Sequence, residues 1–235
     1  MNNYARNLIQ IFRTITVVGD SLTAGFACDG DVRIRSCPAR GERENWPSFL
    51  ARRTGCEVYN NALGGTKAKE WRETFAETVN FKTDCYIVAL GANDHRYGLP
   101  VGTPSDIKEN YEENADSFYG NYDALVRHLL KFNPAAHIFV LTMPSPEDKI
   151  DAKGAYFNDY NEAIRLVAKK NFEKVHLIDL HKNHDKEYTE GLIARHADHE
   201  HYTPIAYNMM STIIEDDINE FIYTHDDLFH MTPYK

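Results

Sequence analysis

The sequence has no run of roughly eighteen or more consecutive apolar residues, the length that a membrane-spanning helix needs. Its first residues also lack the basic segment, apolar segment and cleavage site of a secretory signal. We therefore expect a cytoplasmic protein without membrane insertion, or a secreted one if a signal peptide has been removed. The sequence gives no indication of the oligomeric state.

Basic residues are in the minority, with 26 Lys and Arg against 35 Asp and Glu, and the formal net charge is −9. The acidic excess includes the run Glu215-Asp216-Asp217. Proteins that bind a nucleic-acid backbone need clustered positive charge to neutralise its phosphates. We therefore expect no nucleic-acid partner.

The chain has only four cysteines, Cys28, Cys37, Cys56 and Cys85, and none of them forms a CxxC pair. That spacing does not favour a redox motif or a structural zinc site. Cys56 and Cys85 lie in segments that we expect to be buried strands, so we interpret them as reduced thiols. Cys28 and Cys37 could close a loop in an oxidising compartment.

Apolar runs alternate with helical patterns along the whole chain. Such alternation is typical of a doubly wound parallel sheet, and 235 residues suit a single domain, residues 1–235. The expected strands lie near residues 14–18, 56–60, 85–90, 137–143 and 175–180. Helices are expected from Trp46-Pro47, around Trp71, from Tyr119 to Lys131, from about Ala155 to Lys170, and from Thr203-Pro204, the last directing Ile205, Met209, Ile213 and Ile214 toward the sheet.

A serine follows the first expected strand in the segment Gly19-Asp20-Ser21-Leu22. Open α/β sheets bind their ligands at the carboxyl ends of the strands, so Ser21 is placed as a nucleophile would be. Serine is also a good helix N-cap, and the tetrapeptide alone does not choose between these two interpretations. No G-x-S-x-G motif is present, which argues against an α/β-hydrolase elbow.

A base and its orienting group are available in the segment Asp198-His199-Glu200-His201. Asp198 precedes His201 by three residues, so its carboxylate can accept from Nδ1 and leave Nε2 to take a proton from Ser21. Without the other segments, a solvent-exposed histidine would be a better interpretation of His201 than a catalytic base, because it is one of eleven histidines in the chain.

Two further segments supply candidate oxyanion donors. Asn93 follows the expected strand at 85–90, where its amide could stabilise the negative oxygen of a tetrahedral intermediate, although an asparagine there commonly satisfies a turn. Asp94 is a spare candidate for the orienting carboxylate, which we expect to brace a turn instead. Gly65, in Gly64-Gly65, lets a backbone N–H approach a ligand closely.

Taken together, these four segments resemble the GDSL or SGNH hydrolase family, whose blocks contribute Ser, Gly, Asn and His in that order. The matching residues are Ser21, Gly65, Asn93 and His201, with Asp198 on the family's Asp-x-x-His. The resemblance implies a three-layer α/β/α sandwich around a doubly wound, five-stranded parallel sheet, the flavodoxin-like fold of that family. It also implies a serine esterase or lipase-like acylhydrolase. Ala206 stands where a glycine often follows the histidine, and Asn60-Asn61-Ala62 replaces a more usual Asn-x-Gly.

The predicted reaction is hydrolysis of a carboxylic ester through an acyl-enzyme on Ser21. His201 is the base, Asp198 orients it, and the backbone N–H groups of Ser21 and Gly65 with the amide of Asn93 form the oxyanion hole. No metal or organic cofactor is needed. The family suggests short acyl esters, such as acetyl groups on carbohydrate or small alcohols; lysophospholipids and thioesters stay open.

Functions of two other classes are alternatives to ester hydrolysis by Ser21. The segment from His196 to His201 is dense in metal ligands, but it completes neither H-x-H-x-D-H nor H-E-x-x-H, which disfavours a metal-dependent hydrolase. A non-catalytic sugar- or nucleotide-binding module would fit the same fold. Such a module does not require the set Ser21, Asn93, Asp198 and His201.

Two segments interrupt the alternation and are candidates for substrate selection. The segment from Thr23 to Asn45 carries Arg33, Arg35, Arg40 and Arg43 among acidic residues, which favours a solvated loop over an anion-contacting lid. The segment from His95 to Asn114 places His95, Arg96 and Tyr97 where they could line a pocket. Within it, Thr103-Pro104-Ser105-Asp106 has the pattern of a capping box that starts a helix.

Overall fold

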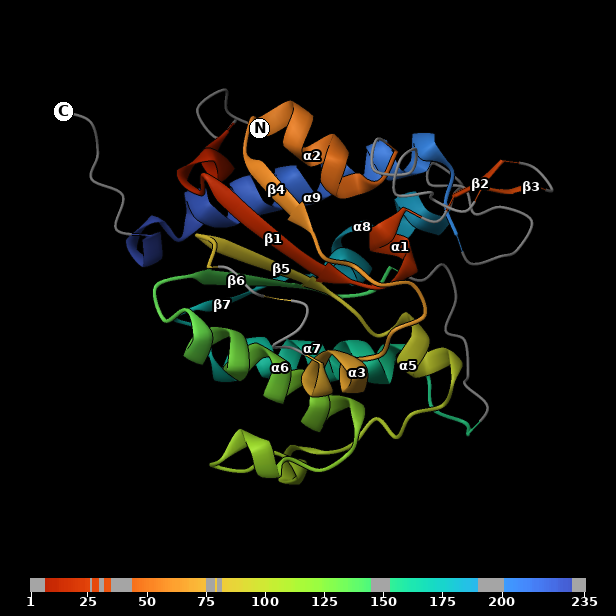
Figure 1. The fold of residues 1–235 in the computed structure, drawn as a ribbon, viewed down its shortest axis with the longest axis vertical. Coiled ribbons are helices and arrows are strands. Elements are labelled where there is room, and N and C mark those ends of the chain that lie inside the picture. The colour runs from red at the N-terminus through yellow and green to blue at the C-terminus, as the bar shows by residue number, and fades with distance from the viewer. Residues whose placement is uncertain are drawn as a thin grey trace.

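The computed structural model describes residues 7–25, 27–29, 32–34, 44–74, 79, 82–144, 153–189 and 201–229. Its centre is a five-stranded, fully parallel sheet in the order β4-β1-β5-β6-β7 (Figure 1). All five strands lie where the apolar runs predicted them. Their bounds are β1 Thr14–Gly19, β4 Glu57–Asn60, β5 Cys85–Ala89, β6 His137–Leu141 and β7 Val175–Ile178.

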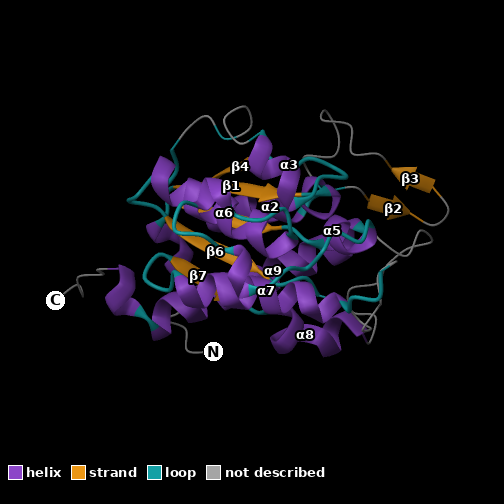
Figure 2. Cartoon of the chain, turned by 90° about the horizontal axis from the view of Figure 1, so that it is seen from below, coloured by secondary structure: helices purple, strands orange, loops and turns teal. Residues whose placement is uncertain are grey.

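Helices cover both faces of this sheet, as Figures 1 and 2 show. The three-layer, doubly wound arrangement predicted from the sequence is therefore confirmed. One face carries η1 (Leu8–Ile11), α2 (Trp46–Thr54) and α9 (Pro204–Thr224); the other carries α3 (Ala68–Glu73), α6 (Phe118–Phe132) and α7 (Phe157–Lys170).

Helices α2, α6 and α9 begin where a side-chain cap accepts from an N–H group of the first turn. Asn45 accepts from the N–H of Ser48 at the start of α2, Ser117 accepts from Gly120 in α6, and Thr203 accepts from Ala206 in α9. Pro204 occupies the first turn of α9, as the sequence predicted. These caps fix the residue at which each helix starts. The cap of α9 also fixes the segment that directly precedes this helix.

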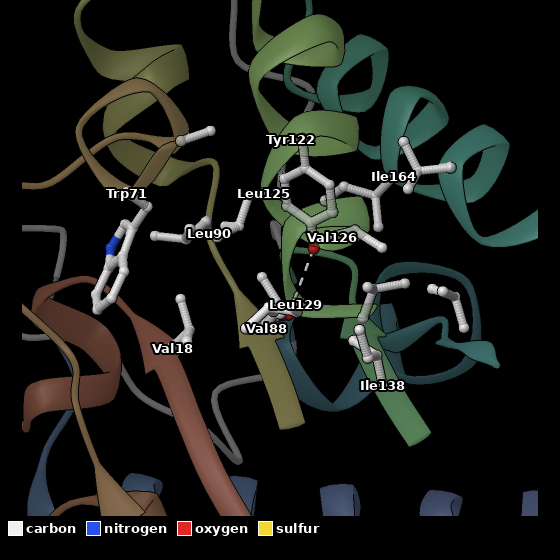
Figure 3. Packing of buried hydrophobic residues seen from close by; sticks show 14 of the residues in the cluster. Val18, Trp71, Val88, Leu90, Tyr122, Leu125, Val126, Leu129, Ile138 and Ile164 are labelled. Carbon is white, nitrogen blue, oxygen red and sulfur yellow. Dashed lines mark hydrogen bonds between the residues drawn. The ribbon is translucent and has the colours of Figure 1, made fainter. Parts of the chain in front are cut away.

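Two hydrophobic cores separate the helical layers from the sheet. Under α6 and α7, Val88 and Ile138 of the sheet pack with Leu125, Val126 and Ile164 (Figure 3). Tyr122 is fully buried there, and its hydroxyl donates to the Val88 carbonyl at 3.4 Å. On the other face Ile15, Val17, Ile87 and Phe139 pack against α2 and α9. With both faces of the sheet covered, the ends of its central strands can present polar groups to a ligand.

The buried face of α9 differs in part from the prediction. Ile214 is buried, and Met209 and Ile213 are partly buried at the edge of the core. The prediction for Ile205 is wrong, because its side chain is 75% exposed. It lies in the first turn, off the stripe formed by Tyr207, Met210, Ile214, Ile218 and Ile222, whose spacing of three or four residues matches one helical face.

Short elements occupy the two interruptions of the pattern. The first contains an antiparallel hairpin of β2 (Ala27–Asp29) and β3 (Val32–Ile34), which the sequence analysis did not predict. The second contains the 3₁₀ turns η3 (Pro104–Asp106) and η4 (Tyr111–Glu113). The capping box at Thr103 is present, but it starts a single turn and not a longer helix. Pairing of Cys28 with Cys37, and the side chains of Arg33, Arg35, Arg40 and Arg43, lie outside the described part.

The remaining described elements lie beside the sheet. They are α1 (Ser21–Ala24), α5 (Ala92–Arg96), α8 (Leu180–Thr189) and η5 (Asp226–Phe229). Cys56 and Cys85 are both buried and unpaired, as expected for reduced thiols. Within the described ranges, no helix has both the length and the apolar character needed to cross a membrane.

Candidate active site

Ser21 is the first residue of α1, directly beyond the carboxyl end of β1. The N-cap of this helix is Asp20, whose Oδ1 accepts from the N–H of Leu22 at 3.0 Å, so the capping role considered for Ser21 belongs to its neighbour. Gly19 permits the turn by its size: a Cβ on it would come within 2.3 Å of Thr23 Oγ1. The serine hydroxyl is thereby left for another partner.

That partner is His201. Its Nε2 lies 2.9 Å from Ser21 Oγ, a hydrogen bond between residues 180 positions apart in the sequence. His201 comes two residues before Thr203, the N-cap of α9, and the packed helix α9 therefore holds it near β1. A serine hydroxyl bonded to an imidazole Nε2 has the geometry of a nucleophile and its general base.

Asp198 lies outside the described residues, together with the preceding His196 and the following His199 and Glu200. Its role in orienting His201 stays a prediction. Asp94 is described, and its carboxylate accepts from the N–H of Ala68 at 3.1 and 3.3 Å. Asp94 is thus bound to the first turn of α3, in agreement with the expectation that it braces a turn.

Asn93 lies beyond the carboxyl end of β5, the strand next to β1. Gly19 and Ala89 are paired across these strands, so the segments that follow them begin side by side. The Asn93 side chain is 7% exposed, and its Nδ2 donates to the Thr66 carbonyl at 3.1 Å and approaches Asp20 Oδ2 at 3.4 Å. The amide nitrogen is therefore directed toward the segment that carries Ser21.

Gly65 lies in a loop that is bound to the end of β1. Leu63 N–H donates to the Gly19 carbonyl at 3.0 Å, and Asn60 Nδ2 donates to the Thr23 carbonyl at 3.0 Å. Gly65 has φ +81°, and a Cβ on it would meet nothing within 4 Å. Within the described residues, the backbone N–H groups of Gly65 and Ser21 have no hydrogen-bond partner. Both are available to an anion.

Two buried carboxyl groups flank this arrangement. Burial raises the pKa of Asp20 to about 7, and backbone hydrogen bonds oppose that shift only in part. Burial likewise raises the pKa of Asp94 to about 7, and the charge of Asp20 adds to this effect. Near neutral pH each group therefore exchanges between its acid and its carboxylate.

No cation site is evident in the described part of the chain, where no three His, Cys, Asp or Glu side chains come together as metal ligands. The candidate ligands between His196 and Glu200 are not described, so the geometry does not test the metal-dependent alternative. Among the described residues, Ser21, Asn93 and His201 are the candidates for catalytic roles.

The second candidate for substrate selection divides into packed and exposed residues. His95 is buried, with its ring 4.8 Å from Phe157 and 5.5 Å from Tyr160, and these contacts make it part of the packing. Tyr97 is 60% exposed, and Lys67 Nζ lies 5.4 Å from its ring centre. Arg96 is exposed as well, so Arg96 and Tyr97 both stay accessible to a ligand, whereas His95 does not.

Sequence reasoning missed Asp20 as part of the site. The structure shows that it contacts both the turn that carries Ser21 and the amide of Asn93. The available signal was its position before Ser21, since aspartate is a preferred N-cap. The contact with Asn93 joins residues 73 positions apart and had no signal in the sequence.

Comparisons with known proteins agree with this geometry. The model of the GDSL-like lipase/acylhydrolase family matches residues 17–209, a range that includes Ser21, Gly65, Asn93, Asp198 and His201. Comparison with curated proteins finds no match.

Solved structures of low sequence identity share the fold. A possible lipase from Chitinophaga pinensis is 16% identical, with a TM-score of 0.64 over 88% of this chain and 98% of that one. The psychrotrophic esterase EstA from Pseudoalteromonas sp., in a structure inhibited by monoethylphosphonate, is 16% identical, with a TM-score of 0.61 over 90% and 99%. A carbohydrate esterase family 2 enzyme with a carbohydrate-binding domain, from Corynascus thermopiles (Myceliophthora fergusii), is 17% identical, with a TM-score of 0.63 over 90% and 67%.

Proposed function

Because the chain belongs to the GDSL-like lipase/acylhydrolase family and is thereby a carboxylic ester hydrolase, we propose that it is a serine esterase with Ser21 as nucleophile and His201 as general base. The observation that carries this proposal is the 2.9 Å contact between Ser21 Oγ and His201 Nε2. A serine hydroxyl is a poor nucleophile when protonated, and a neighbouring imidazole removes that obstacle.

The reaction starts when Ser21 Oγ attacks the ester carbonyl carbon and His201 Nε2 takes the hydroxyl proton. The carbonyl oxygen becomes an oxyanion, which the N–H groups of Ser21 and Gly65 and the amide of Asn93 stabilise. His201 then gives its proton to the leaving alcohol, and an acyl-enzyme remains. Water repeats the cycle and releases the acid, and Asp198 keeps the imidazole in the productive tautomer.

Short acyl esters, in particular acetyl groups on carbohydrate or on small alcohols, are the proposed substrates. The structural similarity to a carbohydrate esterase supports this choice, as does the exposed ring of Tyr97, which offers a flat surface beside the segment of Asn93. A series of p-nitrophenyl esters tests it. Rates should be highest for acetyl and fall with chain length; rates that rise beyond about eight carbons would show that long acyl chains, as in lipids, are preferred.

The catalytic proposal is tested by p-nitrophenyl acetate hydrolysis with the wild type, Ser21→Ala and a control, Ser105→Ala, which alters an exposed serine of η3. Turnover should vanish in Ser21→Ala, persist in Ser105→Ala and resist a chelator. Turnover that survives Ser21→Ala but is lost with the chelator would establish the metal-dependent alternative instead. No turnover by the wild type on any ester, with intact ligand recovered, would favour a binding module.

A further inference from the structure

The Asn93 amide has two ends of similar shape and opposite hydrogen-bonding character. Only its nitrogen can donate to an oxyanion; its oxygen would repel one. Which end faces the reacting atoms therefore matters for catalysis, and the partners of the side chain decide it. In this structure Nδ2 has two acceptors, the Thr66 carbonyl at 3.1 Å and Asp20 Oδ2 at 3.4 Å.

Asp20 is well placed to control the orientation of that amide. Its side chain is almost completely buried, at 2% exposure, so water does not compete for its oxygens. Oδ1 is occupied by the N–H of Leu22 at 3.0 Å, which leaves Oδ2 directed to Asn93. One carboxyl group thus joins the turn of the nucleophile to the neighbouring strand's amide.

We propose that Asp20 is a positioning residue that holds the Asn93 amide with its nitrogen toward Ser21. The proposal rests on the esterase function proposed above. The Thr66 carbonyl anchors the amide from one side, and the longer contact to Asp20 orients the remaining hydrogen while leaving it able to turn to an oxyanion formed at Ser21. Asp20 itself does not touch the substrate.

Two substitutions separate this role from the N-cap role of the same residue. Asp20→Asn keeps an oxygen for the Leu22 N–H but turns an NH₂ group toward Asn93 Nδ2, so that two donors face each other and Asn93 must rotate. Asp20→Ser keeps the cap and removes the second acceptor without adding a donor. We expect kcat to fall about 100-fold in Asp20→Asn and about 10-fold in Asp20→Ser, with KM changed less than about threefold.

A matched control is available in Asp123→Asn. Asp123 is a fully buried aspartate of α6 that accepts from Asn114 Nδ2 at 3.0 Å and lies in the helical layer, away from the site. Its kcat should equal that of the wild type. A loss of kcat in Asp20→Asn that the control shares, or one that a lower thermal midpoint accompanies and explains, would contradict a positioning role.

A double-mutant cycle with Asn93→Ala tests whether Asp20 acts through the amide. Asn93→Ala alone should lower kcat about 100-fold, and adding Asp20→Asn should lower it less than about threefold further, because the group that Asp20 orients is already absent. Losses that multiply in the double variant would overturn the proposal.

A second readout does not depend on activity. The side-chain NH₂ signal of Asn93 in a ¹⁵N–¹H spectrum can be assigned by its absence in Asn93→Ala. It should move in Asp20→Asn and stay in place in Asp123→Asn. An unmoved signal overturns the proposed contact whether or not the protein hydrolyses esters. If the signal moves in Asp20→Asn but the wild type hydrolyses no ester, the contact stands and the esterase function is overturned, and with it the catalytic part of the proposal.

Discussion

The two ends of the parallel sheet bury titratable groups of opposite kinds. At the carboxyl ends, burial raises the pKa values of Asp20 and Asp94 to about 7. At the amino ends of β6 and β7, burial lowers the pKa of His176 to about 3, and nearby positive groups, His137 first, lower it further. In both places burial favours the neutral form of the group. For the aspartates this is the protonated carboxyl group, and for His176 it is the unprotonated imidazole.

The partners of these groups differ as well. Asp20 and Asp94 bind backbone N–H groups of turns and the amide of Asn93. His176 Nε2 lies 2.8 Å from His137 Nδ1, and its ring packs among those of Phe139, Phe221 and Phe229 at 4.9 to 5.2 Å. Polar bonding at the carboxyl ends positions a site, whereas aromatic packing at the amino ends seals the core.

The largest expected effects separate catalysis at one end from stability at the other. Ser21→Ala should lower kcat on the order of 10⁴-fold or more and leave unfolding unchanged, because only the nucleophile is lost. Phe139→Ala should lower the free energy of unfolding by about 3 to 5 kcal/mol through loss of a fully buried ring, with kcat unchanged below the melting transition. Steady-state kinetics and chemical denaturation of both variants measure this. A destabilised Ser21→Ala together with a folded but inactive Phe139→Ala would contradict the assignment of catalysis to one end of the sheet and stability to the other.

The choice of orienting carboxylate produces the next largest effect. Asp198→Asn should lower kcat by roughly 10² to 10⁴-fold yet keep measurable turnover, since His201 loses its orientation and Ser21 remains. Asp94→Asn should lower the thermal midpoint more than kcat, because Asp94 caps α3. The kcat values and melting curves of the two variants are compared side by side. Wild-type activity in Asp198→Asn with a large kcat loss in Asp94→Asn would show that Asp94, and not Asp198, is the carboxylate needed for catalysis.

Stability should depend on pH in opposite directions at the two ends. The folded pKa of Asp94 lies above its ordinary value of 3.8, so this group costs stability as pH rises from about 4 to 7. The folded pKa of His176 lies below 6.5, so this group costs stability as pH falls from 6.5 toward 3.

Melting curves of two variants from pH 4 to 8 isolate these contributions. Relative to the wild type, Asp94→Asn should gain stability with rising pH, and His176→Phe with falling pH, each by at most about 1.4 kcal/mol per pH unit. A difference from the wild type that does not vary with pH would show that the substituted group does not titrate in that window.

The smallest predicted effect concerns the start of α9. Thr203→Ala removes the side-chain oxygen that accepts from the Ala206 N–H at 3.0 Å, which should lower the free energy of unfolding by about 1 kcal/mol. Because His201 lies two residues earlier, kcat should fall only a few-fold, and Thr203→Ser should restore both values. Urea denaturation and turnover are the measurements. A serine variant as impaired as the alanine variant would contradict a capping role.

The strands, and most helices, could be predicted because their signals are local. A buried parallel strand is a short apolar run, and Thr203-Pro204 marks a helix start by itself. Ser21, Asn93 and Gly65 follow such runs, which is why their common placement at one end of the sheet could be predicted. The β2–β3 hairpin lacks an apolar run of that kind and was not predicted.

Contacts between distant segments could not be predicted in the same way. The exposure of Ile205 follows from which face of α9 packs against the sheet, and the contact of Asp20 with Asn93 follows from the pairing of β1 with β5. The bond between His201 and Ser21 was predicted only as chemistry that the residue types allow. Its 2.9 Å length is a property of the folded chain.

The central claim is that Ser21 is activated by His201, and covalent labelling tests it most directly. The wild type, Ser21→Ala and Ser105→Ala are incubated with an organophosphonate, and intact mass and peptide mapping locate the product. We predict one adduct on the peptide that contains Ser21 in the wild type and in Ser105→Ala, and none in Ser21→Ala. An adduct on another residue, or an unlabelled wild type, would contradict the account.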